Sequence, residues 1–345
     1  MTKLFIFLFV TLGFISCQND TQLAEPDVKG GFLKCSVYLL NNDSGKTSKR
    51  LKKDINYNNS GKIIGEIEYN KGGSISASSI YDSLGYKIEK VIYHSDGSLM
   101  FKNLYKLGEN GNPIERVEYN SDNTISRKFL AKYNRFNKCI EELKFDENDS
   151  LIGKAICKYD DKGFMTEFIR YKPINSIIKR IKFKYNTNGK LIERSYYNED
   201  AFWKGSNRYK YDSGNNLIEK TKYNSDSSII WQYSYKYNNR GIVTDGSGYS
   251  VYKTSVTKYK YKYDSFGNRI EKIEYNPLSS KNYIDKYIMK YDKQNNLIES
   301  IWYHGDGSIR EKTLYKYDKF GNKIRVENYN EENEHEGGWE YVYSK

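Results

Sequence analysis

A fixed spacing of tyrosines constrains this chain more than any other feature of its sequence. One position recurs every 26 residues, with one step of 24 at the start and one of 28 after Tyr263. We call the residues at this position the anchors: Tyr57, Tyr81, Leu107, Tyr133, Tyr159, Tyr185, Tyr211, Tyr237, Tyr263, Tyr291, Tyr317 and Tyr343. A period of this size indicates a tandem array in which each repeat packs on its neighbours.

A second aromatic residue stands twelve residues after each of the first eleven anchors. This second row is Tyr69, Tyr93, Tyr119, Phe145, Tyr171, Tyr197, Tyr223, Tyr249, Tyr275, Tyr303 and Tyr329. The chain has 35 tyrosines, and tyrosine and isoleucine in alternation with charged residues are typical of β-strands. We therefore predict an all-β antiparallel hairpin array over residues 51–345, of about 22 strands, wound as a spiralling sheet or solenoid.

Turn chemistry explains the spacing. Asp or Asn follows nearly every anchor, and four residues after each of the first eleven anchors stands Gly or Asn, the residues that tolerate positive φ. These residues are Gly61, Gly85, Gly111, Asn137, Gly163, Gly189, Asn215, Gly241, Gly267, Asn295 and Gly321. The pattern predicts three-residue hairpin loops with a bulge, and the second aromatic opens a similar turn.

Three-residue loops also predict which side chains share a face. If no further residue is inserted, positions an even number from the anchor stay on one face through both turns. That face would be inward or concave and would carry both aromatic rows, whereas the other face would be mostly solvated. It would also carry a glutamate eight residues after the anchor, seen as Glu89, Glu115, Glu141, Glu167, Glu193, Glu219, Glu271 and Glu299.

The segments YKYDSFGNRI around Tyr263 and YKYDKFGNKI around Tyr317 resemble the YD repeats of the Rhs family. The resemblance runs over nearly all of residues 51–345 and implies antiparallel hairpins that wind into a long spiralling sheet, in large proteins a hollow shell. The chain departs from that family by lacking its fuller Asp-Pro-Gly turn, its C-terminal core region and a toxin domain after it. The resemblance therefore implies the architecture without a toxin-enclosing role. A weaker similarity is to MORN-type repeats.

The N-terminal residues predict an export signal. Lys3 precedes an apolar stretch over residues 4–14, which is too short to span a membrane as a helix. The following Phe14-Ile15-Ser16-Cys17 resembles the lipobox of bacterial lipoproteins, which implies lipidation at Cys17. We expect a signal peptide over residues 1–17, a tether and degenerate first hairpin over 18–50, and lipid anchoring in the cell envelope, on either side of the outer membrane. The alternative is an ordinary cleaved signal with a chance cysteine.

Charge and motifs argue against several function classes. The net charge is +12, but 44 acidic residues are interleaved with 56 basic ones, so we expect no nucleic-acid partner. His94 and His304 occupy turn positions, and we find no metal-binding, phosphate-binding or nucleophile motif. We therefore expect neither catalysis nor a cofactor. The repeated glutamates fit hydrogen bonds with tyrosine hydroxyls and lysines better than acid–base work.

Three tryptophans and two cysteines complete the candidate sites. Trp203, Trp231 and Trp339 fall on the predicted inward face and are candidate ligand-binding residues, with packing as the alternative. Cys139 and Cys157 would face each other across adjacent strands and form a candidate disulfide. Two reduced cysteines are the alternative reading, and Cys35 is an alternative partner.

The expected function is that of a noncatalytic envelope lipoprotein that binds a glycan or a protein partner on its tyrosine-rich surface. The main alternative is an Rhs-related accessory or toxin-associated protein. A hydrolase is the least favoured class, because the repeated carboxylates are all alike.

Overall fold

The computed structural model is a single antiparallel β-sheet of 24 strands. It describes residues 29–43, 46–173, 176–251, 256–276 and 284–345. The strands are β1 Lys34–Asp43, β2 Lys46–Tyr57, β3 Ile63–Tyr69, β4 Ile75–Tyr81, β5 Lys87–Tyr93, β6 Leu99–Leu107, β7 Pro113–Tyr119, β8 Ile125–Tyr133, β9 Cys139–Phe145, β10 Leu151–Tyr159, β11 Met165–Tyr171, β12 Ile177–Tyr185, β13 Leu191–Tyr197, β14 Trp203–Tyr211, β15 Leu217–Tyr223, β16 Ile229–Tyr237, β17 Val243–Ser250, β18 Thr257–Tyr263, β19 Arg269–Tyr275, β20 Asp285–Tyr291, β21 Leu297–His304, β22 Ile309–Tyr317, β23 Lys323–Tyr329 and β24 His335–Ser344. The predicted all-β hairpin array is confirmed, with the hairpin β1–β2 ahead of the expected strands.

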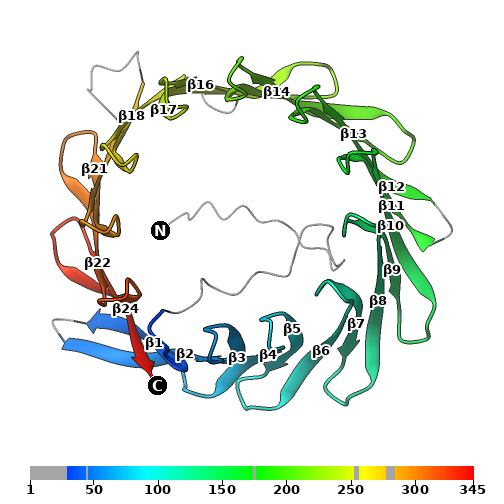
Figure 1. Cartoon of the computed structure of the whole chain (residues 1–345), viewed down its shortest axis with the longest axis horizontal. Helices are drawn as coiled ribbons and strands as arrows, with labels where there is room; N and C mark the ends of the chain where they lie inside the picture. The colour runs from blue at the N-terminus through cyan, green and yellow to red at the C-terminus, as the bar shows by residue number, and fades with distance from the viewer. Residues whose placement is uncertain (1–28, 44–45, 174–175, 252–255, 277–283) are drawn as a thin grey trace.

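The sheet closes on itself. Each strand pairs with the next along the chain, and β1 pairs both with β2 and with β24, so that Cys35 faces Tyr343. Figure 1 shows the resulting ring, in which β1 and β24 lie side by side. Closure pairs every strand on both sides, which removes the exposed edges that an open sheet would present.

The predicted hairpin turns are confirmed at all eleven first turns. In the turn after Tyr263, the N–H of Asp264 donates to the carbonyl of Asn268, and the N–H of Gly267 donates to the carbonyl of Asp264. The Asp264 carboxylate accepts the N–H groups of Phe266 and Asn268, which fixes the loop. The Gly or Asn four residues after each of these eleven anchors has a positive φ, as predicted.

The prediction that both aromatic rows share a face is wrong, because nearly every hairpin contains a second bulge. Tyr133 faces Cys139, but the preceding Lys132 faces Glu141, so Ile140 is an extra residue on its strand. The same one-residue shift follows most other turns, and a one-residue shift moves a whole strand's side chains to the opposite face. The anchors and the second row therefore lie on opposite faces, and the repeated glutamates share the face of the second row.

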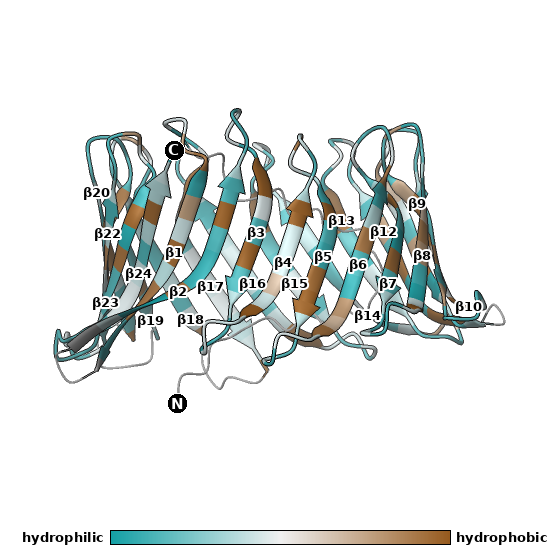
Figure 2. Cartoon of the chain, turned by 90° about the horizontal axis from the view of Figure 1, so that it is seen from below, coloured by the Kyte–Doolittle hydropathy of each residue, from teal (hydrophilic) through white to brown (hydrophobic). Residues whose placement is uncertain are grey.

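Strand direction shows which face is inside. The N–H of Asn58 donates to the carbonyl of Lys62 in the turn to β3, so Asn56, two residues earlier, also turns its N–H toward β3. When a strand of L-residues runs upward and a side chain faces the viewer, the N–H and C=O groups of that residue point to the right. The strand that they bond therefore lies on the right. Figure 2 views the ring from outside, with β2 pointing upward and β3 on its right. The side chain of Asn56 therefore faces outward, and those of Ile55 and Tyr57 face inward.

The anchor tyrosines join neighbouring strands through their hydroxyls. The hydroxyl of Tyr159 donates to the carbonyl of Cys139 at 2.8 Å, and that of Tyr185 donates to the carbonyl of Met165 at 2.9 Å. The same bond recurs from Tyr133, Tyr211, Tyr237, Tyr291, Tyr317 and Tyr343. Each bond reaches back to the strand that follows the previous anchor turn, so it ties consecutive hairpins together.

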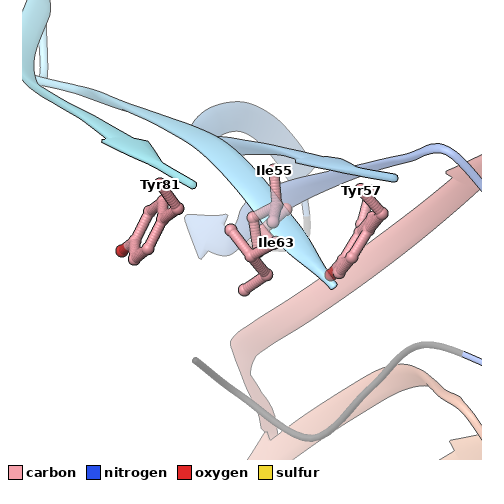
Figure 3. Close-up of a cluster of buried hydrophobic side chains, with 6 residues drawn as sticks. Ile55, Tyr57, Ile63 and Tyr81 are labelled. Carbon is pink, nitrogen blue, oxygen red and sulfur yellow. The ribbon is translucent and has the colours of Figure 1, made fainter. Parts of the chain in front are cut away.

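A compact apolar cluster lies where the ring closes. It contains Cys35, Val37, Ile55, Tyr57, Ile63 and Tyr81, with Trp339, Tyr341 and Tyr343 packed against it. Figure 3 shows Ile55, Tyr57, Ile63 and Tyr81 pointing to the same side of their strands. This cluster packs the first strands of the sheet against β24 and so stabilises the closure of the ring.

Candidate binding surface on the inner wall

The ring is wide enough to hold a ligand. With neighbouring strands roughly 4.8 Å apart, 24 strands give a circumference of about 115 Å and a diameter of roughly 35 Å. Barrels of about 16–18 strands already leave a water-filled interior. Among the described residues, the inward side chains therefore line a lumen and do not form a continuous packed core.

One arc of the inner wall, over β16–β21, is aromatic. Its inward positions on the strands that end at Tyr237, Tyr263 and Tyr291 carry large rings where the opposite arc carries small residues such as Ala131 and Ala155. We call this the aromatic arc and define it by Trp231, Tyr233, Tyr235, Tyr259, Tyr261, Tyr287 and Trp302. All seven side chains are half-buried, so part of each ring remains open to the lumen.

Trp302 is the most constrained residue of the aromatic arc. Its ring stacks on Tyr287 with centroids 5.3 Å apart and an interplanar angle of 20°. Its indole N–H donates to the Asp285 carboxylate at 2.8 Å, and the Arg310 guanidinium lies 3.8 Å from its ring centroid. These contacts hold the indole in one orientation, which is what a preorganised binding platform requires.

Cations lie between the rings of the aromatic arc. The Lys272 ammonium is 5.3 Å from the Tyr259 ring centroid and 4.9 Å from that of Tyr287, and Lys220 lies 5.1 Å from the Trp231 centroid. Burial, with the nearby Asp285 charge, raises the pKa of Tyr287 to about 12. The Tyr287 hydroxyl therefore stays protonated at neutral pH and can donate a hydrogen bond to a ligand.

A second inward group, on the other side of the ring in Figure 1, is cationic. We call Lys144, Arg170, Lys179 and Arg194 the basic arc; they lie on β9, β11, β12 and β13. Arg170 faces Lys179 directly across the β11–β12 ladder. Burial and the neighbouring charges of Arg194 and Arg170 lower the pKa of Lys179.

The repeated glutamates lie on the outer wall. Glu141 accepts Lys132 at 2.7 Å and Lys154 at 3.0 Å, one cation from each flanking strand. Both lysines lower the pKa of Glu141, Lys132 most strongly. Glu167, Glu193, Glu271 and Glu299 each lie between two cations in the same way. These glutamates form the ion pairs with lysine that the sequence predicts. We call this row of glutamates, with its cations, the outer ion-pair ladder.

The three predicted ligand-binding tryptophans do not share a face. Trp231 faces Lys222, and Trp339 faces Val326, which places both on the inner wall. Trp203 faces Tyr197 of the second row and therefore lies on the outer wall, a correction that follows from the extra bulge. The same bulge explains why the sequence does not predict Trp302 as an inward residue. It stands eleven residues after its anchor, and odd positions are expected on the solvated face.

Cys139 and Cys157 both lie on the inner wall and are buried thiols in the structure. The direct cross-strand pairing expected for them is wrong in register, because Ile156 faces Glu141 and so Cys157 is offset by one residue from Cys139. A disulfide between them stays a prediction, which non-reducing peptide mapping of the purified protein would test. Cys17 and the rest of the predicted signal peptide lie outside the described residues.

Two further observations concern the described part of the chain. No group of three or more His, Cys, Asp or Glu side chains within it is placed to hold a metal ion. No helix within it is both long and apolar enough to cross a membrane.

Comparisons with known proteins match the chain in part or at low identity. A protein-family model described as "Uncharacterised protein" matches residues 145–249. No curated protein matches the chain. Among solved structures, TcdB2-TccC3-TEV is similar over 85% of this chain and 18% of its own, at 10% identity and a TM-score of 0.42.

The Photorhabdus luminescens Tc holotoxin pore is similar over 89% of this chain and 18% of its own, at 10% identity and a TM-score of 0.42. The chain thus spans less than a fifth of the length of these two chains. A porin-like protein from Bacteroides uniformis ATCC 8492 is similar over 91% of this chain and 96% of its own, at 8% identity and a TM-score of 0.28.

Proposed function

We propose that this chain is a noncatalytic binding protein of the cell envelope whose inner wall binds a glycan. The aromatic arc is the observation that carries the proposal. Sugar rings present flat C–H faces that stack on indole and phenol rings, while their hydroxyls pair with nearby polar groups. The half-buried rings of Trp231, Tyr233 and Tyr235 offer ring surface to the lumen. Trp302, whose ring lies against Tyr287 and Arg310, adds its open edge beside the polar Asp285 carboxylate.

A polypeptide held inside the ring, as an Rhs-related accessory protein would hold one, is the competing function. One common mode of peptide recognition adds the peptide as an extra strand to a free sheet edge. Every strand of the ring is already paired on both sides, so no sheet edge is free for an added strand. The aromatic arc therefore favours the glycan.

Binding of a polysaccharide panel to wild type and to two matched tryptophan variants tests the function. Trp302→Ala removes the inner platform and should weaken binding of the best polysaccharide about tenfold, the equivalent of about 1.4 kcal/mol. Trp203→Ala removes a tryptophan from the outer wall and should leave affinity unchanged. Isothermal titration calorimetry measures both. Equal losses in the two variants, or no polysaccharide bound by wild type, would contradict the proposal.

We also propose that lipid on Cys17 holds the protein at the envelope. The segment Phe14-Ile15-Ser16-Cys17 supports this proposal, because the apolar stretch before it is too short to anchor the chain by itself. Detergent phase partitioning of wild type and Cys17→Ser measures attachment. Wild type should enter the detergent phase and Cys17→Ser should not; equal partitioning would reject the lipid anchor.

A further inference from the structure

The basic arc is a costly arrangement for the inner wall. Like charges that face each other directly across a ladder destabilise a sheet, and Arg170 faces Lys179 in this way. The charges that act on Lys179 come from Arg194 and Arg170, both cations, and they lower its pKa. Lys144 similarly has its pKa lowered by burial and by Arg127, with Glu118 opposing the shift.

Aromatic rings lie beside two cations of the basic arc, Phe129 at 5.6 Å from Lys144 and Tyr196 at 5.3 Å from Arg194, but the neighbours on β10 are small. Lys144 faces Gly153, and Arg170 faces Ala155, both on β10. Neither residue can cover the head group of the cation beside it. The buried carboxylate of Glu142 lies on the far side of Ala155 and contributes one negative charge that acts on Arg170. Glu142 and Glu118 supply two negative charges against the four cations, so the arc keeps a net positive charge.

Cations on the outer wall are arranged differently. Lys132 and Lys158 lie 2.7 and 2.8 Å from Glu141 and Glu167, so each positive charge has a carboxylate beside it. Inside the ring, Arg116 and Arg127 lie 3.2 and 3.6 Å from Glu118, whereas Arg170, Lys179 and Arg194 follow one another on β11, β12 and β13. Folding alone does not require that difference, because the ladder geometry would accept glutamates on either wall.

We infer that the basic arc binds the acidic groups of an anionic polysaccharide, a uronate polymer being the simplest chemical class. This inference rests on the proposed glycan-binding function and extends it to the charge of the ligand. Carboxylates pair well with arginine and lysine, and partly desolvated cations interact with them more strongly than solvated ones. The aromatic arc supplies the stacking surface that a polymer of sugars needs and an acidic polypeptide does not.

Two forms of one polymer test the inference: polygalacturonate and its fully methyl-esterified, uncharged form. Calorimetry with the full mature chain should show polygalacturonate binding at least about tenfold more tightly, because each charge-assisted contact is a strong one. The double variant Arg170→Gln/Lys179→Gln should lose that preference and bind both polymers alike. The control Lys132→Gln/Lys158→Gln removes equal charge from the outer wall and should keep the preference.

The inner double variant should also fold, because the repulsion that it relieves between Arg170 and Lys179 offsets the positive charge that it takes away from Glu142. A cooperative thermal unfolding transition close to that of wild type would verify this. Equal binding of both polymers by wild type would overturn the anionic subsite and leave glycan binding intact. Polyglutamate bound as tightly as polygalacturonate would overturn the assignment to a polysaccharide. Failure of wild type to bind any polysaccharide would overturn both the inference and the proposed function.

Discussion

At the scale of single residues, the anchor hydroxyl explains why tyrosine recurs at this position. A phenylalanine would fill the same space, but it could not donate to the carbonyl twenty residues earlier, as Tyr159 does to Cys139. That carbonyl lies beside the extra bulge, where the regular ladder is interrupted. The residues that follow each anchor predict the turn. The partner of the tyrosine hydroxyl is not predictable, because it depends on a bulge that no residue type signals.

Tyr159→Phe should therefore lower the free energy of unfolding by about 1 kcal/mol, because it leaves a buried carbonyl without its donor. The expected fall in the thermal midpoint is about 1–2 °C for a chain of this size. Tyr119→Phe is the matched control, since it removes a hydroxyl from the outer row that makes none of these inter-hairpin bonds. Equal changes in the two variants would show that the hydroxyl bond contributes nothing.

At the scale of strands and hairpins, turns were predictable and faces were not. The residue types at Gly267 and Asn295 predict a positive φ, and both residues have one. The second bulge uses ordinary residues such as Ile140, so parity counted from the anchor goes wrong by one. One such extra residue in each of three hairpins places Glu141 and Trp203 on the outer wall and Trp302 on the inner wall, against the count from the anchor.

The outer ion-pair ladder should make the protein sensitive to acid. Lys132 and Lys154 hold the pKa of Glu141 below its ordinary value of 4.5, so the folded state binds that proton less readily than the unfolded chain. This stability is present above the ordinary pKa and is lost as the pH falls through and below it. The thermal midpoint should thus fall between pH 6 and pH 3, by several degrees at low salt.

Two comparisons assign that acid sensitivity to the ladder. Glu141→Gln should show a smaller fall than wild type over the same pH range, whereas Glu147→Gln, at an exposed turn, should match wild type. High salt should reduce the difference, because it screens partly exposed pairs. A pH response identical in all three proteins would exclude the ladder as its source.

At the scale of the whole molecule, closure depends on two glycines of β24. A Cβ at Gly338 would lie 1.9 Å from the Val326 carbonyl oxygen, and one at Gly337 would lie 2.2 Å from that of Leu40. Side chains at these positions would push β24 away from β23 and β1. The repeat pattern predicts the strands but not their closure, because closure depends on strand number and on this seam.

Gly338→Ala should accordingly open or loosen the ring between β24 and its neighbours. We expect faster proteolysis near the seam and association of chains through the exposed edges. Size-exclusion chromatography with light scattering measures that association. Gly73→Ala is the control, because its φ of +84° is also positive but no atom lies within 4 Å of the added Cβ. A monomeric, protease-resistant Gly338→Ala protein would contradict this account of closure.

The pairing of β1 with β24 also sets an order of events in biosynthesis. Cys35 faces Tyr343, so a chain that emerges N-terminus first releases one partner about 300 residues before the other. During that interval β1 has a free edge, and hairpins added one by one extend an open sheet with a second free edge. The entropic cost of the final closure grows only with the logarithm of the chain length. The stage most prone to aggregation is therefore the open sheet before closure. A factor that shields one of its edges until β24 arrives would protect the protein at that stage.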